Sequence, residues 1–168
     1  MSSFTAFTVS RLYEKCSKDR EVFKSLKRAL RKMFREFLVY HHSSLEYRAK
    51  ILTLMIASNG EMCECEQKAL KEIAESIYGN EIDRVELLID TVIEYHSKIV
   101  TNNGLDFEHL IQLVGKETKE VPRFVSKIDM KLLKILHQCV NDEDERLFQE
   151  RILEYLENLK DEYSTKSA

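Results

Sequence analysis

Residues 58–67, SNGEMCECEQ, contain two closely spaced cysteines, and they are the part of this 168-residue chain with the clearest signal for metal or redox chemistry. Cys63 and Cys65 have C-x-C spacing, whereas a thiolate zinc site normally needs four ligands, commonly in two C-x2–4-C pairs. No second pair lies near them in the sequence. We therefore favour a helix start, in which Cys63 is the N-cap and Glu66 completes a capping box. A cysteine-dependent zinc or redox protein is the alternative.

Carboxylates gather in two short stretches that separate apolar helical segments. They supply the hard oxygen ligands that suit Ca²⁺ or Mg²⁺, provided that the two stretches approach each other. No twelve-residue EF-hand loop is present. Solvated helix ends, with negative charge near the N-terminal dipole, explain the same residues equally well. The carboxylates are Glu61, Glu64, Glu66, Asp142, Glu143, Asp144 and Glu150.

No residue pattern typical of an active site is evident in the sequence. Ser-His-Asp sets, glycine-rich phosphate loops and catalytic carboxylate pairs are not recognisable. His41 and His42 are adjacent, and neighbouring residues on a helix point about 100° apart, so they do not readily share a metal. We therefore predict a non-enzymatic protein, with a helical enzyme of unrecognised site as an alternative.

The composition indicates one soluble, helix-rich domain. Hydrophobic residues make up 43% and charged residues 33% of the chain, and only four glycines and one proline favour turns. The first residues, MSSFTAFTVSR, lack the features of a signal peptide, and the uncharged stretch ILTLMIASNG is too short for a membrane span. We expect a cytoplasmic protein without an integral membrane segment, whose four cysteines are free thiols.

Apolar residues recur every three or four positions along most of the chain, which predicts amphipathic helices. Gly79 and Gly115 are each expected to end a helix, and Pro122 fits a first helical turn. The helix over about 81–100 is strongly apolar and is expected to run through the middle of the core. We predict an all-α bundle of about six or seven helices. Their approximate ranges are 18–40, 45–57, 64–78, 81–100, 105–115, 122–140 and 146–162.

The N-terminal residues 1–44 form a distinct basic region. From Lys18 to Glu36 there are eight basic residues and three acidic ones, and the apolar residues lie on one helical face. We expect a basic amphipathic helix that packs on the core. Its basic face could be a solvated surface, or a docking surface for an acidic protein partner, including the acidic residues 142–162 of this chain. Contact with nucleic acid or with an anionic membrane is a third alternative, but the net charge of −3 argues against a dedicated nucleic-acid binder.

A possible repeat relates residues 50–66 to residues 134–150, which align without a gap and suggest two related helical hairpins. Both segments begin with Lys-Ile-Leu, pass through a polar turn and end in Glu, although unrelated helical hairpins share part of this pattern. The first turn, ASNGEMCECE (residues 57–66), resembles the Ala-x-Asp-Gly turn of the TerB-like family, a tellurite-resistance-associated domain that also occurs in DjlA-type co-chaperones. Residues 141–150 resemble a second, degenerate copy.

The resemblance implies a compact all-helical domain over residues 45–162. The polar C-terminal residues favour a flexible tail at 163–168. It also implies a non-enzymatic interaction or signalling module of stress response, with a protein partner and a Ca²⁺ or Mg²⁺ site at the two turns. Asn59 replaces the usual Asp of the first turn, and the second turn lacks glycine. The implied cation ligands are Asn59, Glu61, Glu66, Asp142, Glu143 and Glu150.

Overall fold

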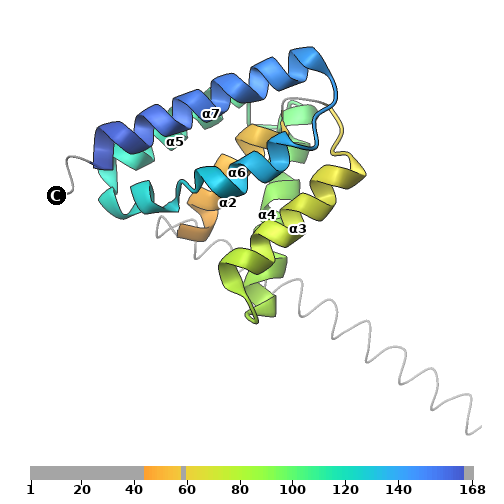
Figure 1. Cartoon of the computed structure of the whole chain (residues 1–168), viewed down its shortest axis with the longest axis horizontal. Helices are drawn as coiled ribbons and strands as arrows, with labels where there is room; N and C mark the ends of the chain where they lie inside the picture. Colours follow the sequence, from red (N-terminus) through yellow and green to blue (C-terminus); the bar gives the residue numbers. More distant parts are fainter. Residues whose placement is uncertain (1–43, 58–59, 165–168) are drawn as a thin grey trace, which may run out of the picture. The chain divides into compact units, whose positions relative to one another are not determined.

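The computed structural model describes residues 44–57 and 60–164 of the chain. The predicted basic N-terminal helix and Asn59 lie outside the described residues. The described residues form α-helices and one 3-10 helix, with no strand, which confirms the all-α prediction. The elements are α2 (Ser44–Ile56), α3 (Glu64–Tyr78), α4 (Ile82–Val100), α5 (Phe107–Glu120), η1 (Pro122–Lys127), α6 (Met130–His137) and α7 (Glu143–Ser164) (Figure 1).

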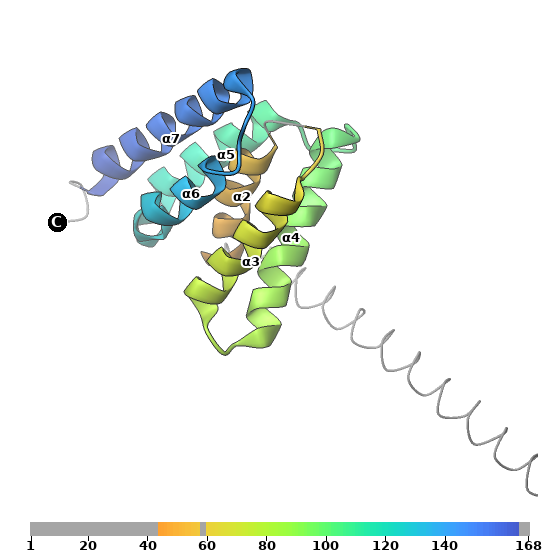
Figure 2. The same cartoon turned by 45° about the vertical axis from the view of Figure 1, so that its right-hand side comes forward.

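Helix α2 is the centre of the described bundle. It contacts α4, α5, α6, α7 and η1, and it lies between the α3–α4 hairpin and the other helices in both views (Figure 1, Figure 2). Eleven of its thirteen residues are buried, because apolar side chains occupy most of its circumference rather than one face. The prediction of a central helix over 81–100 is therefore wrong. Helix α4 is amphipathic, with exposed residues such as Asp90, and it covers α2 from one side.

The α3–α4 hairpin begins at the predicted capping box. The backbone N–H of Glu66 donates to Sγ of Cys63 (3.4 Å), and the N–H of Cys63 donates to Oε2 of Glu66 (2.9 Å). Helix α3 ends at Gly79, whose φ of 56° is left-handed and whose N–H bonds to the carbonyl of Glu75 (2.7 Å). Both boundaries of the helix predicted over 64–78 are confirmed.

Gly115 lies inside α5 and does not end it as predicted. A Cβ atom at this position would lie 2.7 Å from Oη of Tyr155 in α7. That hydroxyl donates a hydrogen bond to the carbonyl of Ile111 in α5 (3.1 Å). Glycine is therefore needed here for the close approach of a neighbouring side chain, and the helix continues to Glu120.

The segment predicted as one helix over 122–140 is divided in two. Pro122 begins the short helix η1, where its missing N–H leaves no hydrogen bond unmade. The side chain of Asp129 then caps a second helix, α6. The interruption places Phe124 against Tyr47 of α2, with the ring centroids 4.4 Å apart and both side chains fully buried.

Helix α7 packs along α5, α6 and η1 and completes the bundle (Figure 1). Its start is capped by Asp142, whose Oδ1 accepts the N–H of Glu145 (3.0 Å), so the predicted acidic turn is the first turn of this helix. The fully buried Gln149 donates to the carbonyl of Met55 in α2 (2.8 Å). Helix α7 extends to Ser164 and so includes the start of the predicted flexible tail. Within the described part of the chain, none of the helices has the length and apolar character needed to cross a bilayer.

Candidate functional site

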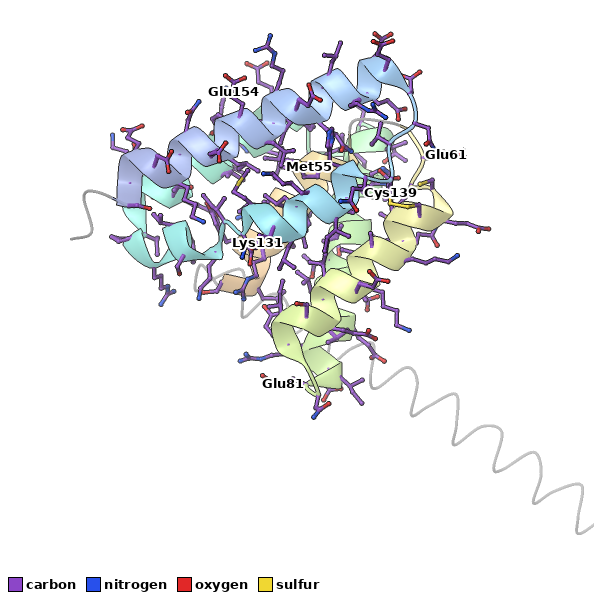
Figure 3. All side chains as sticks on the ribbon, in the orientation of Figure 1. Met55, Glu61, Glu81, Lys131, Cys139 and Glu154 are labelled. Carbon is purple, nitrogen blue, oxygen red and sulfur yellow. A yellow bond between two sulfur atoms is a disulfide. The ribbon has the colours of Figure 1, made fainter. Side chains whose placement is uncertain are left out.

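A disulfide joins the two stretches that the sequence singles out. Cys65, in the first turn of α3, is bonded to Cys139, which follows α6, and their Cα atoms are 5.6 Å apart. The prediction of free thiols is therefore wrong for this pair, whereas Cys63 is a free, exposed thiol. The N-terminal end of α3 consequently lies beside the connection from α6 to α7, and Figure 3 shows Glu61 and Cys139 at this end of the molecule.

Among the residues that the structure describes, the predicted cation ligands are not gathered into a group of three or more. Within residues 44–57 and 60–164, no three His, Cys, Asp or Glu side chains converge as a group that could hold a metal ion. Asn59 lies outside this part of the chain. The two acidic stretches are neighbours, but Asp142 caps α7 and Glu150 lies 3.7 Å from Nε2 of His137. The exposed predicted ligands are Glu61, Asp142, Glu143 and Glu150.

Glu66 differs from these ligands because only 1% of its surface is exposed. Its Oε2 accepts the capping N–H of Cys63, whereas its Oε1 is buried and has no hydrogen-bond partner among the described residues. A buried carboxylate oxygen without a partner is unfavourable unless a cation, proton or water satisfies it. Glu66 is therefore the predicted ligand whose surroundings most favour a bound group.

The alignment of the two hairpins does not make Glu66 and Glu150 equivalent. Helix α3 begins at residue 64 and α7 at residue 143, an offset of 79, whereas the sequence alignment has an offset of 84. Glu66 lies in the first turn of α3 as a buried capping residue, but the side chain of Glu150 is 53% exposed. The similarity of the Lys-Ile-Leu segments therefore does not extend to a shared site at the glutamates.

A groove of about 670 Å³ lies along the α3–α4 hairpin. Two of its lining residues, Ile93 and Val100, are each 47% exposed. Single exposed apolar side chains are common on protein surfaces, but these two border a hollow with further apolar walls, which is typical of a binding surface. We call this the α3–α4 groove. Its apolar lining residues are Met62, Leu70, Ile89, Ile93 and Val100.

His96 adds one polar group to the lining of the α3–α4 groove. It is only 9% exposed, and its Nε2 is buried with no hydrogen-bond partner among the described residues. A molecule that fills the groove would gain a hydrogen bond by satisfying this nitrogen. Residues 61–101, which include the groove, contain ten acidic and four basic residues. The field around the groove therefore favours a positively charged partner.

A buried network of ion pairs and hydrogen bonds, which the sequence patterns did not predict, links α2, α4 and α5. Nζ of Lys50 lies 3.1 Å from Oε1 of Glu46 and 2.5 Å from Oε1 of Glu117, and the hydroxyl of Tyr95 donates to Glu46 (2.9 Å). Burial, together with the Glu46 carboxylate, raises the pKa of Tyr95, so this side chain stays a neutral donor. One feature of the sequence could have indicated this network: Glu46 and Lys50 are four residues apart in a mostly apolar helical segment.

The ionisable groups with shifted pKa values lie away from the clefts. Burial raises the pKa of Tyr47 and of Tyr155, as it does for Tyr95. None of these tyrosines lines the α3–α4 groove or the smaller cleft of about 190 Å³ between α2, α3 and α6.

A scan against protein-family models and searches of curated proteins and of solved structures find no match to this chain. The likeness of residues 57–66 to the TerB-like turn therefore stays a prediction from the sequence.

Proposed function

We propose that this protein is a non-enzymatic interaction module whose α3–α4 groove binds a basic amphipathic helix of a protein partner. The observation that carries this proposal is an apolar groove, with Ile93 and Val100 partly exposed, inside a hairpin of negative charge. An amphipathic helix binds such a groove through apolar side chains spaced three or four residues apart. Basic residues beside that apolar face would match the acidic hairpin.

The charge of the whole helical bundle supports the same partner chemistry. Residues 44–164 contain 25 acidic and 15 basic residues, a balance of −10. A surface with this field attracts cationic partners and increases their rate of association at low ionic strength. The groove volume of about 670 Å³ lies within the range of about 300–1,000 Å³ that is common for binding pockets. Apolar side chains of the partner would provide affinity, and its basic side chains would provide selectivity.

Replacement of Ile93 with lysine tests the groove directly. We expect this substitution to weaken binding of a synthetic amphipathic helix of leucine and lysine by about tenfold or more, because it removes apolar contact and adds like charge. The measurement is a fluorescence-anisotropy titration of the labelled peptide with the full chain at two salt concentrations. Binding to the unchanged protein should weaken as salt increases.

Ile82→Lys is the matched control for this titration. Ile82 is also on α4 and is 68% exposed, but it does not line the α3–α4 groove. Its replacement adds the same charge to the same helix, so affinity should change by less than about threefold. Equal loss of affinity in the two variants would contradict the groove as the binding surface. So would equal affinity for a peptide in which glutamate replaces every lysine.

Cation binding at the start of α3 is a second candidate function, favoured by the buried Oε1 of Glu66 that has no partner. If Ca²⁺ or Mg²⁺ binds there, a concentration ten times the dissociation constant should stabilise the fold by about 1.4 kcal/mol. The melting temperature should then rise by about 3–5 °C. Thermal unfolding of the full chain, with and without each cation at millimolar concentration, measures this response.

Glu66→Gln is the control for the cation response. Glutamine is suited to the same capping-box position, so the helix start should be kept while the charge is removed. The cation-dependent rise in melting temperature should disappear in this variant. An unchanged melting temperature of the natural chain at millimolar Ca²⁺ and Mg²⁺, or an equal rise in the Gln variant, would rule out a site at Glu66.

A further inference from the structure

We infer that Cys63, Cys65 and Cys139 form a thiol–disulfide exchange site, in which the Cys63 thiolate displaces Cys139 from Cys65. The three cysteines lie at the start of α3 and just after the end of α6. Cys65 and Cys139 form the disulfide, and Cys63 is a free thiol separated from Cys65 by one residue along the chain. Cys63 and Cys65 are both exposed, whereas Cys139 is only 9% exposed. The attacking thiol and the sulfur it attacks are therefore on the accessible side of the site.

The backbone spacing permits a bond between Cys63 and Cys65. Residue 64 is helical, which sets the Cα atoms of its two neighbours about 5.4 Å apart. Disulfides typically span Cα separations of about 4.4–6.8 Å. Side chains two positions apart on a helix diverge, so the bond requires the first turn of α3 to open. This turn is held by the two capping hydrogen bonds between Cys63 and Glu66, and helix ends are where local opening is easiest.

The exchange is balanced without any oxidant or reductant. Cys63 loses its proton, and its thiolate attacks Sγ of Cys65. The bond from Cys65 to Cys139 breaks, the electron pair leaves on Sγ of Cys139, and that sulfur takes up the proton. One disulfide and one thiol are present before and after the step. An external monothiol follows the same chemistry: it attacks Cys65 to form a mixed disulfide, and Cys63 then displaces it as a thiol.

The exchange has a structural consequence at the α3–α4 groove. The bond between Cys63 and Cys65 replaces the capping box and releases α3 from its covalent link to the end of α6. Met62, the residue before Cys63, lines the groove together with Glu61. The state of the three cysteines is therefore coupled to the shape of one end of the groove.

Peptide mapping after incubation with glutathione tests the exchange. The full chain is compared with its Cys63→Ser variant, both in a Cys16→Ser background so that a fourth cysteine does not compete. Serine is a preferred N-cap, so the start of α3 should be retained in the variant. Free thiols are alkylated before tryptic digestion, which separates residues 51–68, with Cys63 and Cys65, from residues 135–146, with Cys139.

We expect the chain with Cys63 to yield peptide 51–68 with an internal disulfide, together with alkylated Cys139. In the Cys63→Ser variant, a mixed disulfide of glutathione with Cys65 should accumulate to a higher level, because Cys63 is absent and only the Cys139 thiol remains to displace glutathione. Equal accumulation in the two proteins would overturn the proposal. It would equally be overturned if only the link between peptides 51–68 and 135–146 were found in the chain with Cys63, or if that link were absent before glutathione was added.

Discussion

Replacing both Cys65 and Cys139 with serine should lower the free energy of unfolding by about 4 kcal/mol. The disulfide joins residues 74 positions apart, and the conformational freedom that a disulfide removes from the unfolded chain grows with the length of the closed loop. A domain of this kind is stable by about 5–15 kcal/mol in total, so the loss is large. Urea unfolding under non-reducing conditions, followed by circular dichroism, measures the difference.

Cys63→Ser is the matched control for the disulfide. It removes a sulfur from the same turn but keeps a side chain that accepts the N–H of Glu66, so the stability should change by less than about 1 kcal/mol. The natural chain after reduction should unfold at the same urea concentration as the double variant. A double variant as stable as the natural oxidised chain would show that the disulfide does not stabilise the fold.

Replacing Lys50 with methionine should destabilise the fold by about 3–5 kcal/mol. Lys50 is only 6% exposed and is the ammonium group shared by the Glu46 and Glu117 carboxylates, which are also buried. Methionine has a similar length and fills the space. The loss of stability therefore measures the effect of removing the charge, not the effect of leaving a cavity. The same urea unfolding measurement determines this change.

Lys71→Met is the matched control for the buried charge. Lys71 pairs with Glu75 four residues later on α3, but the two side chains are 66% and 52% exposed. An exposed pair of this kind contributes at most about 1 kcal/mol, so its loss should be small. Equal effects of the Lys71 and Lys50 substitutions would contradict a structural role for the buried network.

Local sequence rules predicted both ends of α3, where short-range interactions decide the structure. Cys63 and Glu66 are three residues apart and form their capping box within a single turn. Gly79 ends α3 because the left-handed backbone there favours glycine. Gly115 was misjudged because its role depends on Tyr155, 40 residues away along the chain. A glycine at a helix end and one at a close packing contact look alike in sequence.

The central helix was misassigned because apolar length does not measure burial. The segment 81–100 is longer than α2, and α2 contains three charged residues, of which Glu46 and Lys50 are buried although their residue types favour the surface. Their burial is stabilised by Glu117, 67 positions after Lys50, and by Tyr95 of α4. Periodicity alone could not predict that pairing, because the partners come from two other helices.

The candidate site was predicted only in part. Sequence spacing identified the first acidic turn and the capping role of Cys63, but it could not identify the disulfide, since connectivity among four cysteines is not fixed by sequence. The sequence contained only a weak signal for the α3–α4 groove. Ile89, Ile93 and Val100 form a second apolar stripe on α4, although a helix needs only one such stripe to pack on the core. Whether such a stripe is covered depends on tertiary packing.

Chemical-shift mapping of the full, isotope-labelled chain is the most direct test of the proposed groove interaction. The protein is titrated with the leucine–lysine helix, and the amide resonances are followed. Saturable shift changes should concentrate in residues 60–71 and 89–101, the two segments that contain the lining of the α3–α4 groove. Changes confined to α5 and α7, or no saturable change at millimolar peptide, would contradict the assignment of this groove as the partner-binding surface.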